Sequence, residues 1–159
     1  MVRTSIIVYA GLIAGVLDIA AAMTSSVLSG RSPIVLLQFI SSAIFGNRAF
    51  SGGLPMAALG LLLHFAIALT WAAVFAFGYA RWRIIGQHPI PAGLAYGAFV
   101  WLVMNLVVLP QTNIRHVAAS TSRLVWGIAF IVFLVGLPIS LVVHSGQQRI
   151  PSADEDAHK

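Results

Sequence analysis

The sequence contains little charge and no cysteine. Of its 159 residues, 8% are Asp, Glu, Lys or Arg, whereas 59% are hydrophobic. A soluble domain carries about 25% charged residues, and a soluble chain of this size cannot keep so much apolar surface away from water. The absence of cysteine excludes a disulfide-stabilised secreted domain. The composition therefore excludes an ordinary soluble enzyme and predicts a chain that lies in a lipid bilayer.

Clustered positive charge is also missing. The net charge is +5, but the nine Lys and Arg residues are scattered, and the densest group is Arg81-Trp82-Arg83. Binding to nucleic acid requires many clustered cations. Basic residues that flank membrane spans explain the distribution, so we expect the lipid bilayer, and no nucleic acid, as a partner.

Four apolar segments are long enough to cross a membrane, which takes about 20 helical residues. They lie at residues 6–28, 54–79, 91–109 and 124–143. Each is continuously apolar and lacks the alternation of a membrane β-strand, which favours helices over a barrel. We predict an all-α membrane protein in which residues 1–144 form a bundle of four transmembrane helices.

A fifth apolar segment, residues 33–45, is too short to span the membrane. Ser32 is suited to an N-cap and Pro33 to the first helical position, while Gly46 and Asn47 suit the end of a helix. We predict a short interfacial or re-entrant helix after the first span. A buried apolar connector between the spans is the alternative.

The two ends of the chain carry different signals. Residues 145–159 are polar and end in a mixed-charge run, which is typical of a disordered tail. The first span resembles a secretory signal, but Asp18 within it disfavours cleavage, and we expect the span to be retained. A small excess of basic residues on the side of both termini favours cytoplasmic termini.

Glycines recur at helical spacing in three of the predicted spans. Residues four apart lie on one face of a helix and, when small, let another helix approach closely. We therefore predict that five glycines form the helix-packing seam: Gly11, Gly15, Gly60, Gly93 and Gly97.

Asp18 is the only acidic residue in any predicted span. A carboxylate near the membrane centre costs about 2.5–3.5 kcal/mol on insertion scales, so it should find a partner. His64 in the antiparallel second span has a depth that agrees with that of Asp18 within roughly 3 Å. Asn105 lies in the same half of the membrane, and Arg48 is placed to reach inward. We predict a candidate intramembrane polar cluster of these four residues.

This cluster has two interpretations. One is a proton or ion relay or a small polar-ligand site, as in a minimal proton-linked transporter or channel. A four-span transporter would need to form a homo-oligomer to enclose a path. The other is interhelical hydrogen bonding within a structural or accessory bundle, worth about 0.6 and at most about 2 kcal/mol per bond. The sequence alone favours the structural interpretation, with no assigned biochemical activity.

Motifs for catalysis or cofactor binding are missing from the sequence. It has no nucleophile elbow, no Walker loop and no dinucleotide-binding motif. The histidines lack metal-ligand spacing, and His64 and His144 lie at different depths, which disfavours a haem between them. We expect no catalytic residues, no metal and no cofactor.

Several short motifs resemble a group of small bacterial integral membrane proteins that is loosely similar to the YagU-like family, a family linked with acid resistance. They are Gly-Leu-Ile-Ala-Gly-Val-Leu-Asp-Ile at 11–19, Gly-Arg-Ser-Pro at 30–33, Phe-Ser-Gly-Gly at 50–53, Leu-Gly-Leu-Leu-Leu-His-Phe at 59–65 and Gly-Leu-Pro at 136–138. The group often has a histidine shortly before Gly-Leu-Pro, where this chain has 130–133 Phe-Ile-Val-Phe. The resemblance implies a multi-pass protein of the bacterial inner (plasma) membrane. It implies no reaction. Independently of the resemblance, the small-residue faces of the predicted helices favour a second copy or another membrane protein as a partner.

Overall fold

A computed structural model describes residues 2–112 and 121–148, and all regular secondary structure in these ranges is helical. Five helical stretches there are long and apolar enough to cross a membrane, against the four that the sequence predicts. The elements in order are α1 (Thr4–Leu28), α2 (Pro33–Phe45), η1 (Gly46–Ser51), α3 (Gly53–Arg81), α4 (Arg83–Gln87), α5 (Pro89–Val103), η2 (Met104–Val108), η3 (Leu109–Gln111), α6 (Thr121–Phe130), η4 (Ile131–Gly136) and α7 (Leu137–Gln148).

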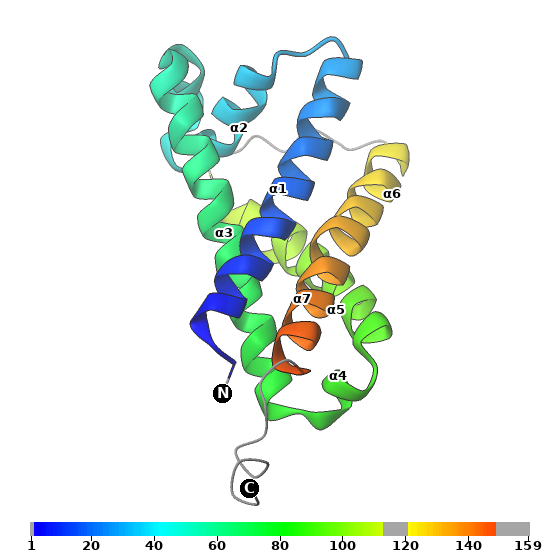
Figure 1. The fold of residues 1–159 in the computed structure, drawn as a ribbon. Coiled ribbons are helices and arrows are strands. Elements are labelled where there is room, and N and C mark those ends of the chain that lie inside the picture. Colours follow the sequence, from blue (N-terminus) through cyan, green and yellow to red (C-terminus); the bar gives the residue numbers. More distant parts are fainter. Residues whose placement is uncertain (1, 113–120, 149–159) are drawn as a thin grey trace, which may run out of the picture.

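Four long helical rods run alternately up and down the molecule (Figure 1). The first is α1 and the second is α3, while α5 with its extension η2–η3 forms the third and α6–η4–α7 the fourth. Because the direction alternates, α1 begins and α7 ends at the same end of the bundle. The helix α2 lies beside the opposite end of α3.

The short helix α2 begins and ends at the predicted residues. The Ser32 hydroxyl accepts a hydrogen bond from the Ile34 N–H at 3.3 Å, and the helix ends at Gly46, whose φ of 58° suits glycine. The Gln38 side-chain amide donates to the Gly53 carbonyl at 3.0 Å. The middle of α2 is thereby tied to the first residue of α3.

Pro138 lies inside the fourth rod without ending it, whereas Pro110 lies in the last turn of the third rod, which ends at Gln111. A wide π-helical turn precedes each of these prolines: η2 ends two residues before Pro110, and η4 ends two residues before Pro138. Proline has no N–H to donate to the carbonyl four residues earlier, and a π-helical turn accommodates such a missing bond within a continuing helix.

The chain beyond the last predicted span differs from expectation. Residues 145–148, which the sequence assigns to a disordered tail, are polar as predicted but continue the helix α7, where the Ser145 hydroxyl donates to the Leu141 carbonyl at 2.8 Å. Residues 149–159 lie outside the described residues.

The predicted glycines lie where helices meet. A Cβ at Gly11 or Gly15 would come within 3 Å of Leu69 or Phe65 of α3, and a Cβ at Gly60 would meet the Leu37 carbonyl of α2. These contacts leave no room for a side chain. Close backbone approach therefore joins α1 and α2 to α3.

The same arrangement joins the third and fourth rods. A Cβ at Gly93 would lie 2.9 Å from the Ser140 Cβ, and a Cβ at Gly97 would lie 2.5 Å from the Val132 Cα. Thus the Gly-x-x-x-Gly pair of α5 contacts η4–α7 much as the pair of α1 contacts α3. The fourth rod also packs on α1 around Ala14 and Ile139.

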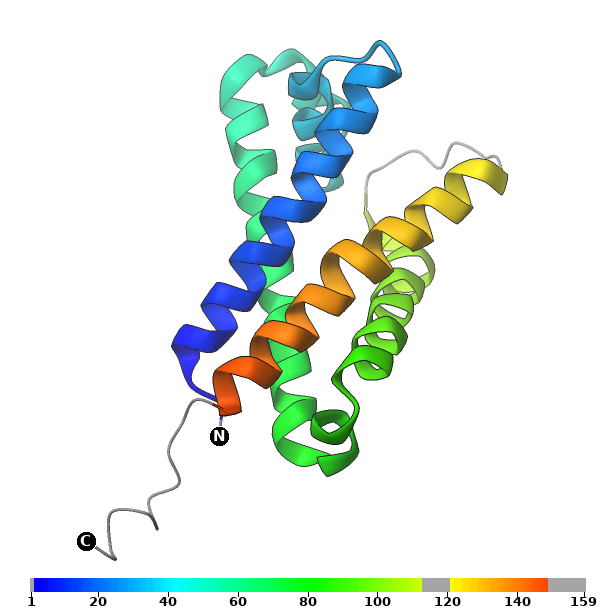
Figure 2. The same cartoon turned by 45° about the vertical axis from the view of Figure 1, so that its right-hand side comes forward.

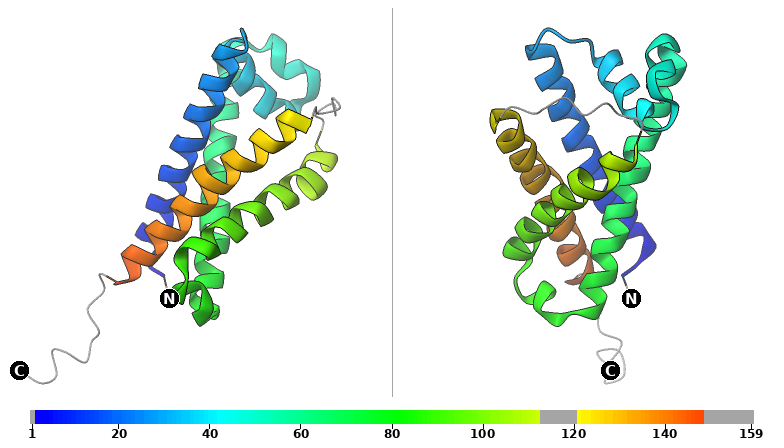
Figure 3. Two further views of the ribbon diagram at one scale, coloured as in Figure 1. Left: turned by 90° about the vertical axis from the view of Figure 1, so that its right-hand side faces the viewer. Right: turned by 180° about the vertical axis from the view of Figure 1, so that it is seen from behind.

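The two helix pairs separate toward the end that carries α2. Figure 2 shows α5 and α6 leaning away from α1 and α3 in this direction, and Figure 3 shows the same divergence from the side. The space between the pairs is bounded by α2, and it contains the candidate site.

Substitution of Gly97 by Ala tests the seam. Since the added methyl group meets the backbone of Val132, we expect the free energy of unfolding to fall by about 1–3 kcal/mol. The matched control is Gly127→Ala in α6, where the nearest atom, Trp101 Nε1, is 3.5 Å away. Thermal unfolding in detergent measures both, and equal stability of the two variants would contradict the packing.

Candidate functional site

Asp18 of α1 and His64 of α3 face each other across the first helix seam. The distance between His64 Nδ1 and Asp18 Oδ2 is 4.0 Å. The His64 side chain is 13% exposed and that of Asp18 is 28% exposed. The structure therefore brings together the two residues that the depth argument paired.

A second contact fixes the ring of His64. Its Nε2 lies 2.9 Å from the backbone carbonyl of Gly15, one turn before Asp18. A carbonyl can only accept, so Nε2 carries a hydrogen and donates it. The ring also packs edge-on against Phe65 at a centroid distance of 5.5 Å. His64 thus hydrogen-bonds α1 with one nitrogen and turns the other toward the carboxylate.

This tautomer has a consequence for the proton count of the pair. In a neutral ring protonated at Nε2, Nδ1 is an acceptor, and it faces another acceptor, the ionised carboxylate of Asp18. Within the described chain, that carboxylate receives no hydrogen bond, and 4.0 Å exceeds the length of a direct one. One added proton, on either Nδ1 or the carboxyl group, converts the contact from repulsive to attractive. The His64 Nδ1 and the Asp18 carboxylate are therefore two facing acceptors, and a proton on either of them would join them.

The pair borders a cavity of about 290 Å³ between the two helix pairs. Its wall is formed by residues of α1, α2, α3, α5, η2, η3 and η4, nearly all of them apolar. Of the eighteen described residues that line it, Asp18 and His64 alone are titratable. A protonatable pair therefore faces a mainly apolar chamber.

One side of the cavity reaches the outer surface of the bundle. Phe39 and Ile44 of α2 and Ile67 of α3 belong to its lining, yet they are 44%, 56% and 38% exposed. Exposed apolar side chains at this depth contact lipid in a membrane. The cavity wall therefore includes apolar residues of α2 and α3 that are exposed.

The predicted polar cluster did not include the two aromatic residues of the cavity wall, Trp71 and Phe39. Trp71 lines the cavity, and its ring contacts Tyr96 and Phe99 of α5 edge-on at 6.3 and 6.2 Å. The available signal is its spacing, because Trp71 follows His64 by two helical turns on the same face of α3. The Tyr96 hydroxyl donates to the Trp71 carbonyl.

The structure does not place Asn105 and Arg48, the other two residues of the predicted polar cluster, beside Asp18 and His64. The Asn105 amide donates to the Trp101 carbonyl of its own rod at 2.9 Å, and Asn105 is not among the lining residues, although Met104 is. Arg48 is exposed in η1, where its backbone carbonyl accepts from the Ser51 hydroxyl. A similar depth in the membrane does not by itself bring two side chains into contact. The Asn105 side chain points along its own helix, and Arg48 lies in the turn after α2.

Comparison with known proteins assigns no family. No protein-family model matches the chain, and no curated protein or solved structure matches it either. The site is therefore interpreted from its own geometry.

A double-mutant cycle tests the contact between Asp18 and His64. We expect the effects of Asp18→Asn and His64→Leu on the free energy of unfolding to be non-additive by about 0.6–1.7 kcal/mol, the usual range for polar contacts between membrane helices. The control cycle combines Asp18→Asn with Asn105→Leu and should be additive within about 0.5 kcal/mol. Additivity in the first cycle would contradict the contact.

Proposed function

We propose that the chain crosses the membrane four times and that α2 with η1 forms a re-entrant segment. The helix α2 has 13 residues, a length of about 20 Å against a hydrocarbon thickness of about 30 Å. The chain turns at Gly46, and α1 ends where α3 begins, at one end of the bundle (Figure 3). Both observations support a segment that enters the membrane and returns.

We further propose that the cavity is a ligand site coupled to the proton of the Asp18–His64 pair, as in a minimal proton-linked transporter. The observation that carries this proposal is that the pair lines the cavity. Ligand sites are concave and mainly apolar, with a few polar groups that orient the ligand. An ionisable side chain inside a membrane protein typically marks a substrate or proton pathway.

The exposure of Asp18 supports this function over a purely structural one. If the pair only joined helices, burial against protein would avoid the cost of an uncompensated charge. Instead the carboxylate is 28% exposed and receives no hydrogen bond from the described residues. Binding of a proton or ligand there would supply the missing partner.

A structural or accessory role is the second candidate. It is favoured by the hydrogen bond from His64 to the Gly15 carbonyl, which crosses the closely packed seam between α1 and α3. In that case the cavity is a by-product of helix divergence. The two candidates differ in whether any molecule binds in the cavity.

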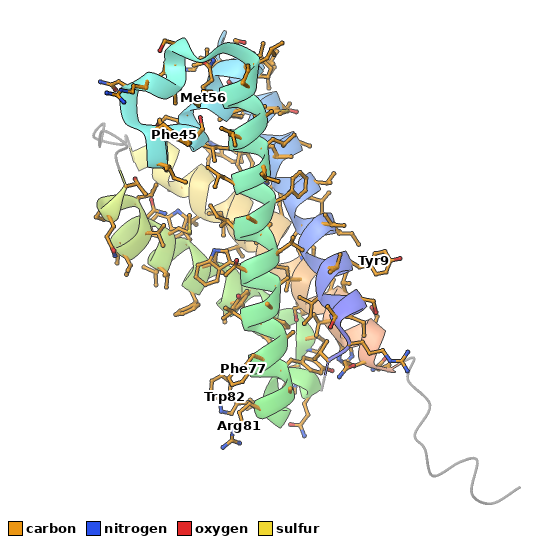
Figure 4. All side chains as sticks on the ribbon, turned by 90° about the vertical axis from the view of Figure 1, so that its left-hand side faces the viewer. Tyr9, Phe45, Met56, Phe77, Arg81 and Trp82 are labelled. Atoms are coloured by element: carbon orange, nitrogen blue, oxygen red, sulfur yellow. The ribbon has the colours of Figure 1, made fainter. Side chains whose placement is uncertain are left out.

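We propose the bacterial inner membrane as the location, on the strength of the resemblance in sequence, with both termini cytoplasmic. Figure 4 shows Phe77, Arg81 and Trp82 projecting outward where α3 ends, near the start of α1. Exposed aromatic and basic side chains are typical of a membrane–water interface, and basic ones of its cytoplasmic side. Self-association would complete a transport path that four helices do not enclose.

Cysteine labelling distinguishes four spans from five. The chain has no cysteine of its own. A thiol reagent therefore has a single target in each of the variants Ser29→Cys, Ser51→Cys and Gln87→Cys. All three positions are exposed. We expect an impermeant thiol reagent to label positions 29 and 51 from one side of the membrane and position 87 from the other. Labelling of positions 29 and 51 from opposite sides would show that α2–η1 spans the membrane.

Binding of a neutral apolar probe tests the ligand site. At a concentration of ten times its Kd, tert-butylbenzene should stabilise the protein by about 1.4 kcal/mol. Ala43→Phe fills the cavity from α2 and should abolish this effect. The control Ala66→Phe adds the same ring at an exposed position of α3 and should retain it. If the wild-type protein shows no stabilisation, the structural role is the better description.

A further inference from the structure

We infer that the ligand of the cavity is an organic monocation with an aromatic or aliphatic body, and that it binds in exchange for the single proton of the Asp18–His64 pair. This inference rests on the proposed ligand site and names its ligand class and its coupling. Three properties of the cavity carry it: its charge, its lining and its access.

The charge of the lining selects a cation. Asp18 and His64 are the titratable groups among the described lining residues, and no Lys or Arg belongs to that lining. With its proton bound the pair is neutral, and without it the pair has one negative charge. A monocation beside Asp18 restores neutrality, whereas an anion would be repelled in a region of low dielectric constant.

The lining does not suit a divalent metal ion. Ca²⁺ takes six to eight oxygen ligands, and Mg²⁺ retains several waters. The described residues contain no group of three His, Cys, Asp or Glu side chains that is able to hold a metal ion. A cavity with one carboxylate and an apolar wall matches a weakly hydrated organic cation.

The aromatic side chains fit the same ligand class. Trp71 lies two turns from His64 in the wall, and Phe39 lines the cavity from α2. An organic cation is attracted to an aromatic face, most strongly to that of tryptophan. Asp18 and Trp71 therefore provide a charged and an aromatic contact to one ligand.

Size and access limit the ligand further. A volume of about 290 Å³ lies at the lower end of the range for small-molecule pockets. The exposed lining residues Phe39 of α2 and Ile67 of α3 form the proposed route of entry, and their apolar character favours a molecule that partitions into lipid. A small amphipathic cation meets both conditions.

Exchange conserves charge and needs no other reactant. The cation arrives next to Asp18, and the proton leaves from Nδ1 of His64 or from the carboxyl group to the buffer. Nε2 keeps its hydrogen bond to Gly15 throughout. The Tyr96 hydroxyl, which donates to the Trp71 carbonyl, is not part of the cavity lining. One cation bound should thus release one proton.

The experiment uses phenyltrimethylammonium and its neutral isostere tert-butylbenzene with the full chain in a neutral detergent. Calorimetric titration in buffers of different ionisation enthalpy measures the affinity and the number of protons released. In the pH range where the free pair is protonated, we expect about one proton to be released per cation bound. In that range the affinity for the cation should fall by about tenfold for each unit by which the pH is lowered. The affinity for tert-butylbenzene should not depend on pH.

Two variants at position 18 complete the test. Asp18→Asn removes the charge and should weaken binding of the cation by about 100-fold while tert-butylbenzene still binds, which also shows that the variant is folded. Asp18→Glu keeps the charge and should retain cation binding and proton release.

The outcomes separate this inference from the proposed function. If tert-butylbenzene binds but the cation does not, or if the cation binds without proton release, the inference is overturned and the ligand site remains. If neither probe binds to the wild-type protein, both proposals fail.

Discussion

The candidate site of this bundle is built around one carboxylate placed in an apolar helix. Asp18 is the only acidic residue before the C-terminal run at 154–156, and its cost within a membrane has to be offset by a partner or by a proton. His64 provides the partner at 4.0 Å. Because its other nitrogen donates to the Gly15 carbonyl, Nδ1 and the carboxylate face each other as two acceptors, which a single proton on either would join.

This contact requires close packing on one side and open space on the other. The glycines of α1 bring its backbone near Phe65 and Leu69, and only such an approach places the Gly15 carbonyl within reach of His64. On the opposite side, α5 and α6 diverge from α1 and α3 (Figure 2), and α2 closes part of the space. The short helix thus forms a wall of the cavity, a role that its length and sequence did not indicate.

Local signals in the sequence predicted the helices and the central pair. Ser32-Pro33 and Gly46 mark the ends of α2, and the depths of Asp18 and His64 follow from counting residues along two antiparallel spans. The rotation of each helix does not follow from depth, which explains why Asn105 and Arg48 lie apart from the pair. The cavity arises from the divergence of two helix pairs, a property of tertiary packing. The extension of α7 over residues 145–148 lies beyond the apolar pattern from which the end of the last span was predicted.

The most direct measurement of the shared proton is the ¹⁵N magnetic resonance spectrum of the His64 ring in lipid, recorded as a function of pH in a variant whose other four histidines are replaced. We expect Nε2 to carry a hydrogen at every pH, because it donates to the Gly15 carbonyl, and the titration of Nδ1 to change when Asp18 is replaced by Asn. A neutral ring protonated at Nδ1, or a titration that is the same with and without the Asp18 carboxylate, would contradict the central claim.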